Sequence, residues 1–123
     1  MILTGGVRTP SDALVGPVAV ATIRSLRVEM LFMGVHGADA RAGLTTPKLM
    51  EAETNRAFSD SARHLVVLAD HTKWGIVGLS QIAALSDVAT FVTDNGLPPD
   101  AQGTLAIRAG ELLVARVPDG EGT

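Results

Sequence analysis

The sequence predicts an α/β protein with a mostly parallel sheet that carries helices on both faces. Apolar runs rich in β-branched residues at 28–35, 65–69 and 89–94 are too short for helices and do not alternate with polar residues, as is typical of strands buried on both sides. Segments with helix signals separate these runs, an order that favours parallel strands joined by helical crossovers. The chain is 46% hydrophobic but only 3% aromatic, so aliphatic side chains must form its core.

Local signals set the bounds of the expected elements. Pro17 falls in a first helical turn, and Thr46 followed by Pro47 predicts a helix start at which the threonine hydroxyl is the N-cap. Gly110 stands where a left-handed residue would close a helix. In chain order we expect a strand stub at 2–3, a helix at 17–26, a strand at 28–35, a helix from 46 to about 63, a strand at 65–69, a short helical turn at 79–85, a strand at 89–94, a helix at 99–109 and an antiparallel or edge strand at 111–117.

Length and charge limit the classes of function. At 123 residues the chain fits one domain that can bury about two-thirds of its unfolded surface, with 118–123 as a solvated tail. The net charge is −3 and the ten Lys and Arg residues are scattered, which disfavours direct binding of nucleic acid. The sequence has no cysteine, no leader-like start and no apolar run of about 18 residues. These absences predict a cytoplasmic protein without a membrane partner.

Polar residues follow three of the predicted strands. In parallel α/β sheets, ligands bind in the crevice beyond the carboxyl ends of the strands. The segments 34–39, 69–73 and 92–96 are expected to reach that edge. Asp70 and Lys73 are therefore candidates for a binding site, although a surface ion pair between them would equally explain their presence.

Other candidate residues have an ordinary structural explanation beside a functional one. Gly5 and Gly6 form either a tight turn or a cradle for an anion. Asp39 either holds a turn through its side chain or contacts a ligand. Thr45 and Thr46 are expected to cap a helix whose start could also hold an anion. No spacing typical of a metal, cofactor or nucleophile motif occurs, so neither a metal nor a cofactor is predicted.

Six short segments occur in an informative order and spacing. They are Thr4-Gly5-Gly6, Val15-Gly16-Pro17, the run at 32–46, Glu51-Ala52-Glu53, the run at 68–75 and the run at 91–94. Together they resemble the carboxyl-terminal effector domain of DeoR-family transcriptional regulators, over residues 3 to about 116. The resemblance implies a ribose-5-phosphate-isomerase-like sensor fold, truncated at the N-terminus, in which residues 1–117 form a partial domain that binds a phosphorylated sugar or related metabolite.

The resemblance also implies roles for single residues. Gly37 and Asp39 match a Gly-x-Asp segment whose acid is expected to hold sugar hydroxyls. Lys73 matches the lysine of an Asp-Ser-Ser-Lys-Phe-Gly-like motif and is expected to neutralise a phosphate, while Asp70 of the same motif is expected to fix the loop or a ligand hydroxyl. The remaining matches near the pocket are Gly5, Gly6, Thr45 and Thr46.

The family pattern further implies what this sequence lacks. It contains no counterpart of the family's winged helix-turn-helix or of the opening part of the sensor, so an effector would act on DNA through a domain absent from this chain. The missing strands would leave a sheet edge unpaired, which favours a homo-oligomer. One alternative is an isomerase-like enzyme with Glu51 or Glu53 as base. The isomerase's paired acids are missing, so no catalytic residue is predicted; a nonfunctional remnant is the other alternative.

Overall fold

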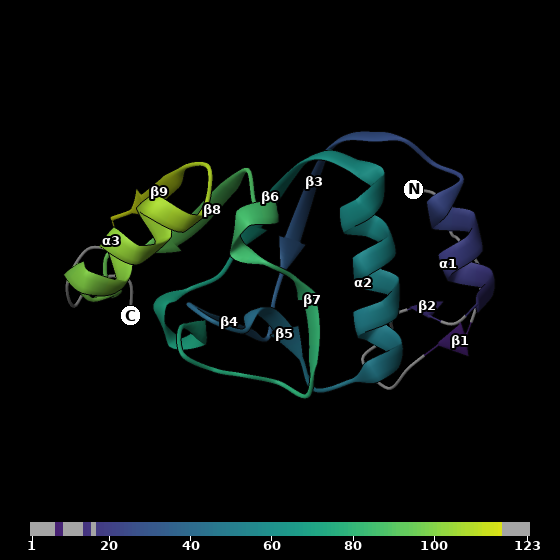
Figure 1. Cartoon of the computed structure of the whole chain (residues 1–123), viewed down its shortest axis with the longest axis horizontal. Helices are drawn as coiled ribbons and strands as arrows, with labels where there is room; N and C mark the ends of the chain where they lie inside the picture. The colour runs from purple at the N-terminus through teal and green to yellow at the C-terminus, as the bar shows by residue number, and fades with distance from the viewer. Residues whose placement is uncertain (1–6, 9–13, 16, 117–123) are drawn as a thin grey trace.

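The larger of the sheets is four-stranded and entirely parallel (Figure 1). This computed structural model describes residues 7–8, 14–15 and 17–116. In spatial order the strands are β3 (Val28–Gly34), β6 (Ala62–Leu68), β8 (Thr90–Asp94) and β9 (Leu112–Ala115). The α/β class and the mostly parallel sheet are thereby confirmed. The last strand lies at an edge, as expected, and it is parallel to β8 rather than antiparallel.

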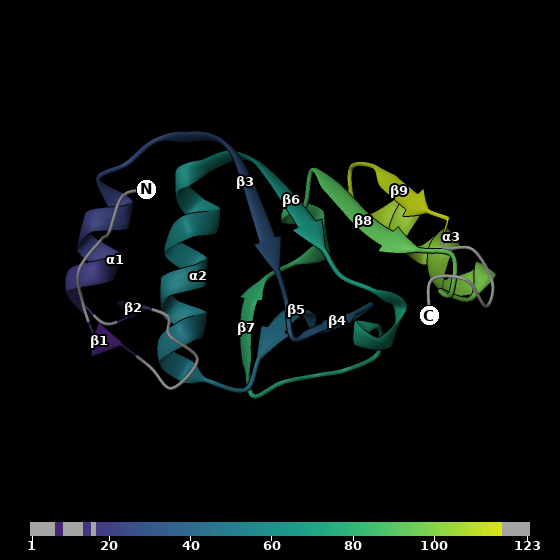
Figure 2. The same cartoon turned by 180° about the vertical axis from the view of Figure 1, so that it is seen from behind.

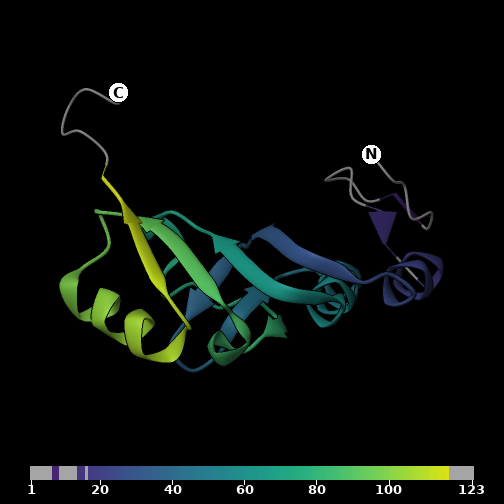
Figure 3. The same cartoon turned by 90° about the horizontal axis from the view of Figure 1, so that it is seen from above.

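Helix α1 (Pro17–Arg24) precedes the parallel strands, and the helices α2 (Leu49–Ser61) and α3 (Pro99–Arg108) lie in the connections between them. The connection from β6 to β8 contains the 3₁₀ turns η1 (His71–Lys73) and η2 (Leu85–Asp87). Figures 2 and 3 show α2 and α3 on the same side of the larger sheet. In the described part of the chain, helices therefore cover one face of the larger sheet, and not both faces as the sequence predicts. None of the described helices is both long and apolar enough to cross a membrane.

A smaller antiparallel sheet lies beside α2 and was not predicted. Its strands, in spatial order, are β4 (Gly37–Asp39), β5 (Gly43–Thr46) and β7 (Ser80–Ala83), while β1 (Val7–Arg8) pairs with β2 (Leu14–Val15) separately. The helical turn predicted at 79–85 is wrong over β7. Those residues pair with β5 and bury Ile82 and Ala83, and this long-range pairing outweighs the local helical tendency.

Two predicted helix caps are also wrong. Helix α2 begins at Leu49 with Lys48 in the N-cap position, because Thr46 continues β5 and a residue before proline favours extended backbone. Gly110 has no left-handed conformation: the C-cap of α3 is the extended Ala109. A glycine is needed at 110 for space, since a Cβ there would lie 2.6 Å from the carbonyl oxygen of Ala89.

The core lies between the larger sheet and the elements on its covered face. It is aliphatic, as the composition predicts, and its fully buried members include Leu44, Val67, Val88 and Leu105. These residues come from the smaller sheet, the larger sheet, the end of η2 and α3. The same core therefore anchors all the elements whose ends form the site described below.

The other face of the larger sheet carries exposed apolar side chains. In the parallel register, Leu68 pairs with Gly34 and Val92, and Val92 pairs with Leu113, so these residues share a face with the even-numbered residues of β3. The most exposed apolar side chains on this face are Met30 (50%), Phe32 (62%), Leu68 (46%) and Leu113 (48%). Parallel sheets are usually covered on both faces, so this surface is unusual for a parallel sheet.

Candidate functional site

A hollow of about 350 Å³ lies at the carboxyl ends of β3 and β6. Its size is within the roughly 300–1,000 Å³ typical of small-molecule pockets. Its wall is formed by Gly34, Val35, His36, Leu68, Ala69, Asp70 and Lys73. Two of the predicted site residues, Asp70 and Lys73, thus meet at one hollow. His36 is not among the site residues that the sequence predicts. It directly follows the strand expected at 28–35 and would therefore reach the same edge of the sheet.

The segment that carries Asp70 and Lys73 forms a tight 3₁₀ turn. Asp70 is the N-cap of η1, and its Oδ1 accepts a hydrogen bond from the backbone N–H of Thr72 at 2.8 Å and another from the Thr72 hydroxyl. The Thr72 hydroxyl and backbone N–H lower the pKa of Asp70 below its ordinary value. The backbone N–H of Lys73 donates to the carbonyl oxygen of Asp70 at 3.1 Å. The turn therefore presents an ionised carboxylate and an ammonium group on one wall.

The far end of this segment is attached to β4. Trp74 forms an isolated parallel bridge with Ala38, and the backbone N–H of Gly75 donates to the carbonyl oxygen of Ala38 at 2.7 Å. Gly75 has φ of +82°, a conformation that favours glycine. The Trp74 side chain packs against the main core. These contacts join the Lys73 turn to the smaller sheet.

Asp94, at the end of β8, contacts the other end of the Lys73 turn. Its Oδ1 lies 2.8 Å from the Nδ1 of His71, and its Oδ2 accepts from the His71 backbone N–H at 3.1 Å. Burial raises the pKa of Asp94, but hydrogen bonds from the backbone N–H groups of Gly96 and His71 and from the His71 ring outweigh it and lower the pKa. Among the described residues, Asp70, His71 and Asp94 have possible metal-ligand atoms within 4.8 Å of one another, but the His71 ring and Asp94 already bond each other.

Asp39 lies at the end of β4 and holds a turn. Its Oδ2 accepts hydrogen bonds from the backbone N–H groups of Arg41 at 2.9 Å and Ala42 at 3.0 Å. These two groups, Ala42 first, lower the pKa of Asp39 below its ordinary value of 3.8. Asp39 is absent from the wall of the hollow, so its expected contact with a ligand stays a prediction.

We expect Asp39 to contribute to stability in a pH-dependent way. Its pKa is lower in the folded protein than in the unfolded chain, so the contribution is present above the unfolded value and is lost as the pH falls through the folded value. Between neutral pH and about pH 3, the melting temperature of Asp39→Asn should therefore fall less than that of the wild type. Circular dichroism measures both melting temperatures. An equal loss in both proteins would show that these hydrogen bonds do not couple Asp39 to folding.

The predicted site residues Gly37, Thr45 and Thr46 do not line the hollow. The Thr45 hydroxyl accepts from the backbone N–H of Gly78 at 2.8 Å, and the Thr46 hydroxyl accepts from that of Lys48 at 3.5 Å. Both threonines are buried in the smaller sheet. Gly37 is buried at the start of β4, where backbone from the 76–78 segment passes close to it. Residues 5 and 6 fall outside the described residues, so the structure does not place Gly5 and Gly6.

The glutamates considered as a catalytic base lie on α2. Glu51 is buried and Glu53 is exposed, and neither belongs to the wall of the hollow. A base must come within hydrogen-bond reach of the proton that it removes. Within the described residues, the hollow at the strand ends is therefore lined by groups suited to binding, without either of these carboxylates.

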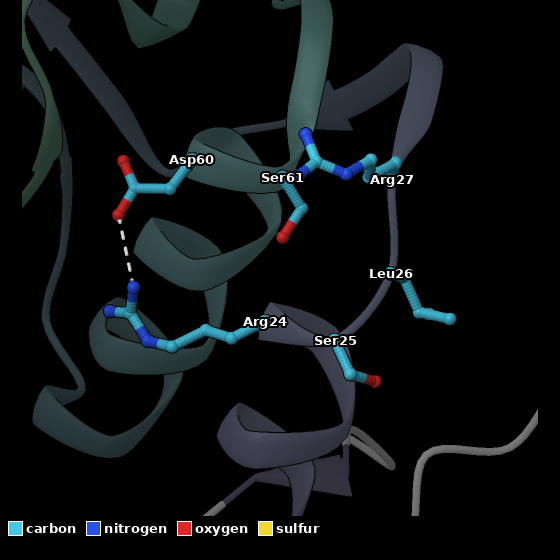
Figure 4. Close-up of a pocket in the computed structure, with 6 residues that line it drawn as sticks. All are labelled: Arg24, Ser25, Leu26, Arg27, Asp60 and Ser61. Atoms are coloured by element: carbon cyan, nitrogen blue, oxygen red, sulfur yellow. Dashed lines mark hydrogen bonds and ion pairs between the residues drawn. The ribbon is translucent and has the colours of Figure 1, made fainter.

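A second hollow, of about 270 Å³, lies near the amino ends of β3 and β6 (Figure 4). Its wall comes from the end of α1 and the end of α2, and it includes two arginines. Nη1 of Arg24 lies 3.5 Å from Oδ2 of Asp60, and Figure 4 shows the Arg27 side chain extending toward Ser61. Ligands of parallel sheets bind at the opposite edge, so we use this second hollow as a reference surface for control variants.

Comparison with known proteins identifies the family. A model of the DeoR C terminal sensor domain matches residues 1–95. The HTH-type transcriptional regulator GlpR of Haloferax volcanii is 36% identical over 101 residues, which are 81% of this chain and 40% of that protein. The regulator YgbI of Escherichia coli is 32% identical over 94% of this chain and 46% of its own length. The glycerol-3-phosphate regulon repressor of Escherichia coli is 27% identical over 76% of this chain and 38% of its own length.

The match covers most of this chain but only part of each relative. The chain spans less than half the length of each of these three relatives. The matched family model describes a sensor domain, and it includes β3, β6 and β8, the Lys73 turn and Asp94. The chain belongs to the DeoR family of transcriptional regulators, through its C-terminal sensor domain.

Proposed function

We propose that this chain is an effector-binding domain that takes a phosphorylated sugar or a related phosphorylated metabolite at the hollow beside Lys73. The observation that carries the proposal is that Lys73 and Asp70 share one wall at the carboxyl edge of a parallel sheet. The ion pairs among the described residues do not include Lys73. Lys73 is a half-buried residue at the hollow, and its ammonium group is therefore suited to an anionic ligand.

The other groups on the wall suit the rest of such a ligand. Asp70 carries a carboxylate that accepts hydrogen bonds, as sugar hydroxyls require, and His36 adds a ring that can donate or accept. Gly34 has no side chain, and the nearest atom to a Cβ built there is 3.9 Å away. The hollow thus combines one cation for a phosphate with groups for hydroxyls. Asp39, Gly37, Thr45 and Thr46 remain predicted to support this site from β4 and β5.

Binding would serve regulation rather than turnover. The relatives are named as transcriptional regulators, which supports a non-enzymatic role in the cytoplasm. An effector with different affinities for two states of a regulator shifts the population between them. We propose that the effector acts in this way on a DNA-binding part of a whole regulator. Because the ten Lys and Arg residues are scattered along the sequence and the net charge is −3, DNA itself is not proposed as the partner of this chain.

A melting-temperature screen tests the proposal. The panel contains glycerol 3-phosphate, suggested by the name of one relative, together with ribose 5-phosphate, fructose 1-phosphate and their unphosphorylated counterparts. We expect a rise in melting temperature with at least one phosphorylated compound and not with its counterpart. The same samples are assayed for isomerisation of ribose 5-phosphate. Turnover that Glu51→Gln or Glu53→Gln abolishes would favour an enzyme, and no shift with any compound would contradict effector binding.

We further propose that two copies of this chain associate through β3 and the apolar face beside it. Strand β3 lies at an edge of the larger sheet, so one row of its backbone groups has no strand neighbour among the described residues. Its Met30 and Phe32 side chains are at least half exposed, and Leu68 and Leu113 extend the same surface. A long apolar edge strand is a common site of pairing between chains. A second copy would supply both a strand and a cover for this face.

Replacing Phe32 by lysine should weaken this association. A charge on the apolar face beside the β3 edge would need to be desolvated when the copies meet, so we expect the variant to sediment as a monomer at concentrations where the wild type dimerises. Ile107→Lys is the matched control, because Ile107 is 85% exposed on α3. Sedimentation velocity over a concentration series measures both. A wild type that stays monomeric throughout, or equal dissociation of both variants, would contradict the proposed surface.

A further inference from the structure

The carboxylate of Asp94 joins the ends of two neighbouring strands. It accepts hydrogen bonds from the backbone N–H of His71, which follows β6, and from that of Gly96, which follows β8. The His71 ring adds a contact of 2.8 Å to the same carboxylate. Only 17% of the Asp94 side chain is exposed, whereas 48% of the His71 side chain is. Asp94 is thus a partly shielded acceptor at the start of the Lys73 turn.

The Lys73 turn is held at both ends by groups outside it. Asp94 holds its start on the β8 side, and the hydrogen bond from Gly75 to Ala38 holds its end on the β4 side. Between these attachments, the Asp70 cap and the Lys73 backbone hydrogen bond fix the local geometry of the turn. Asp94 itself does not line the hollow. Its contacts are therefore with the protein segment that carries Lys73, and not with the space in which a ligand would lie.

Gly96 provides the room for this arrangement. A Cβ at residue 96 would lie 2.6 Å from the Nδ1 of His71 and 2.8 Å from the Oδ1 of Asp94. Both distances are too short for a carbon atom, and the His71 side chain is the group that can move. A side chain at 96 would therefore separate the His71 ring from Asp94 while leaving both residues in the chain. Asp94, His71 and Gly96 together form what we call the strand-end clamp.

We propose that Asp94, through the strand-end clamp, is the positioning residue that holds Lys73 at the wall of the hollow. This inference rests on the proposed function, since it assigns to Asp94 the placement of the cation that would bind the effector. Hydrogen bonds to an ionised carboxylate are stronger than those between neutral groups, so one carboxylate can order several residues of a short turn. The clamp also links the Lys73 turn to the segment that leads from β8 into α3.

The first experiment measures amide hydrogen exchange in the Lys73 turn without any ligand. In Asp94→Ala we expect amide hydrogen exchange to accelerate at least about tenfold at His71 and Gly96, and also through the rest of the turn, measured by NMR. Asp87→Ala is the matched control, because Asp87 likewise accepts from the Ala84 backbone N–H at the start of η2. The control should accelerate exchange at η2 only. Unchanged exchange in the Lys73 turn of Asp94→Ala would overturn the inference whether or not an effector binds.

The second experiment is a double-mutant cycle with glycerol 3-phosphate and ribose 5-phosphate as probes. Asp94→Ala should weaken binding about tenfold when Lys73 is present and less than about twofold in Lys73→Ala, because residues that act through one another are not additive. Asp94→Asn, which keeps an acceptor oxygen, should recover part of the affinity. Equal losses in both backgrounds would overturn the positioning role. Calorimetric titration measures all four proteins.

A variant that leaves the Asp94 carboxylate in place provides an independent check. Gly96→Ala should reproduce the weaker binding of Asp94→Ala, because its methyl group displaces the His71 ring. Gly103→Ala is the control, since no atom lies within 4 Å of a Cβ at that position on α3. If neither probe binds the wild type, the proposed function fails, while the exchange experiment still decides whether Asp94 positions the turn. Binding by Gly96→Ala at wild-type strength would count against the clamp.

Discussion

Replacing Lys73 by alanine is expected to weaken binding of a phosphorylated effector by about 10- to 100-fold. A hydrogen bond to a charged group contributes about 1.5–3 kcal/mol, and Lys73 is the only lysine on the wall of the hollow. Lys73→Arg keeps the charge and should retain part of the affinity, with altered geometry. Titration calorimetry with the best compound of the screen measures the loss. The same variant should abolish most of the ligand-induced rise in melting temperature.

The control for this result is Arg27→Ala. It changes the net charge by the same amount but lies at the second hollow, near the amino ends of the strands (Figure 4). We expect it to leave effector affinity within about twofold of the wild type, since exposed charges at a distance are screened by salt. Similar losses in Arg27→Ala and Lys73→Ala would mean that binding depends on overall charge. That outcome would contradict a site at the carboxyl edge.

Gly37→Ala is expected to produce the largest loss of stability. A Cβ at residue 37 would lie 2.1 Å from the carbonyl oxygen and 2.8 Å from the carbonyl carbon of Ile76, and 3.0 Å from the Thr45 Oγ1. Backbone atoms cannot rotate away as a side chain can, so β4 and the 76–78 segment must separate. Overpacking of this kind costs about 3 kcal/mol, at the upper end of the usual range. The melting temperature should fall by roughly 10 °C.

Gly103→Ala is the matched control for this prediction. It adds the same methyl group to a glycine in the interior of α3, where a Cβ meets no atom within 4 Å. Because glycine is unfavourable in helices, we expect this variant to gain up to about 1 kcal/mol. Thermal and urea unfolding measure both variants. If Gly37→Ala unfolded at the same temperature as the wild type, this result would contradict the close contact between residue 37 and the Ile76 backbone.

Much of the parallel sheet could be predicted from the sequence because its signals are local. The apolar runs at 28–35 and 89–94 contain strands β3 and β8, and the start of α3 coincides with Pro99. The edge at which Asp70 and Lys73 lie follows from the order of strands and helices alone. Asp70 and Lys73 are therefore the part of the candidate site that the local pattern and the family resemblance could predict.

The remaining features depend on contacts between distant residues. Strand β7 has only four residues and forms because β5 pairs with it, so a local pattern could not distinguish it from a helical turn. The Thr46 side chain is buried by the same pairing and does not cap α2. The contact between His71 and Asp94 spans 23 residues and requires β6 and β8 to be neighbours. None of these contacts has a signal in the residues next to it.

The parallel register also bears on the order in which the chain folds. Val28 pairs with Ala62 and Val67 pairs with Phe91, so each pairing must close a long loop, whereas the hairpin of β4 and β5 joins Asp39 to the nearby Gly43. Non-local pairings form more slowly than local ones. The hollow between the ends of β3 and β6 therefore exists only after such a pairing is complete. An effector bound there is expected to slow the unfolding of the chain rather than to speed its folding.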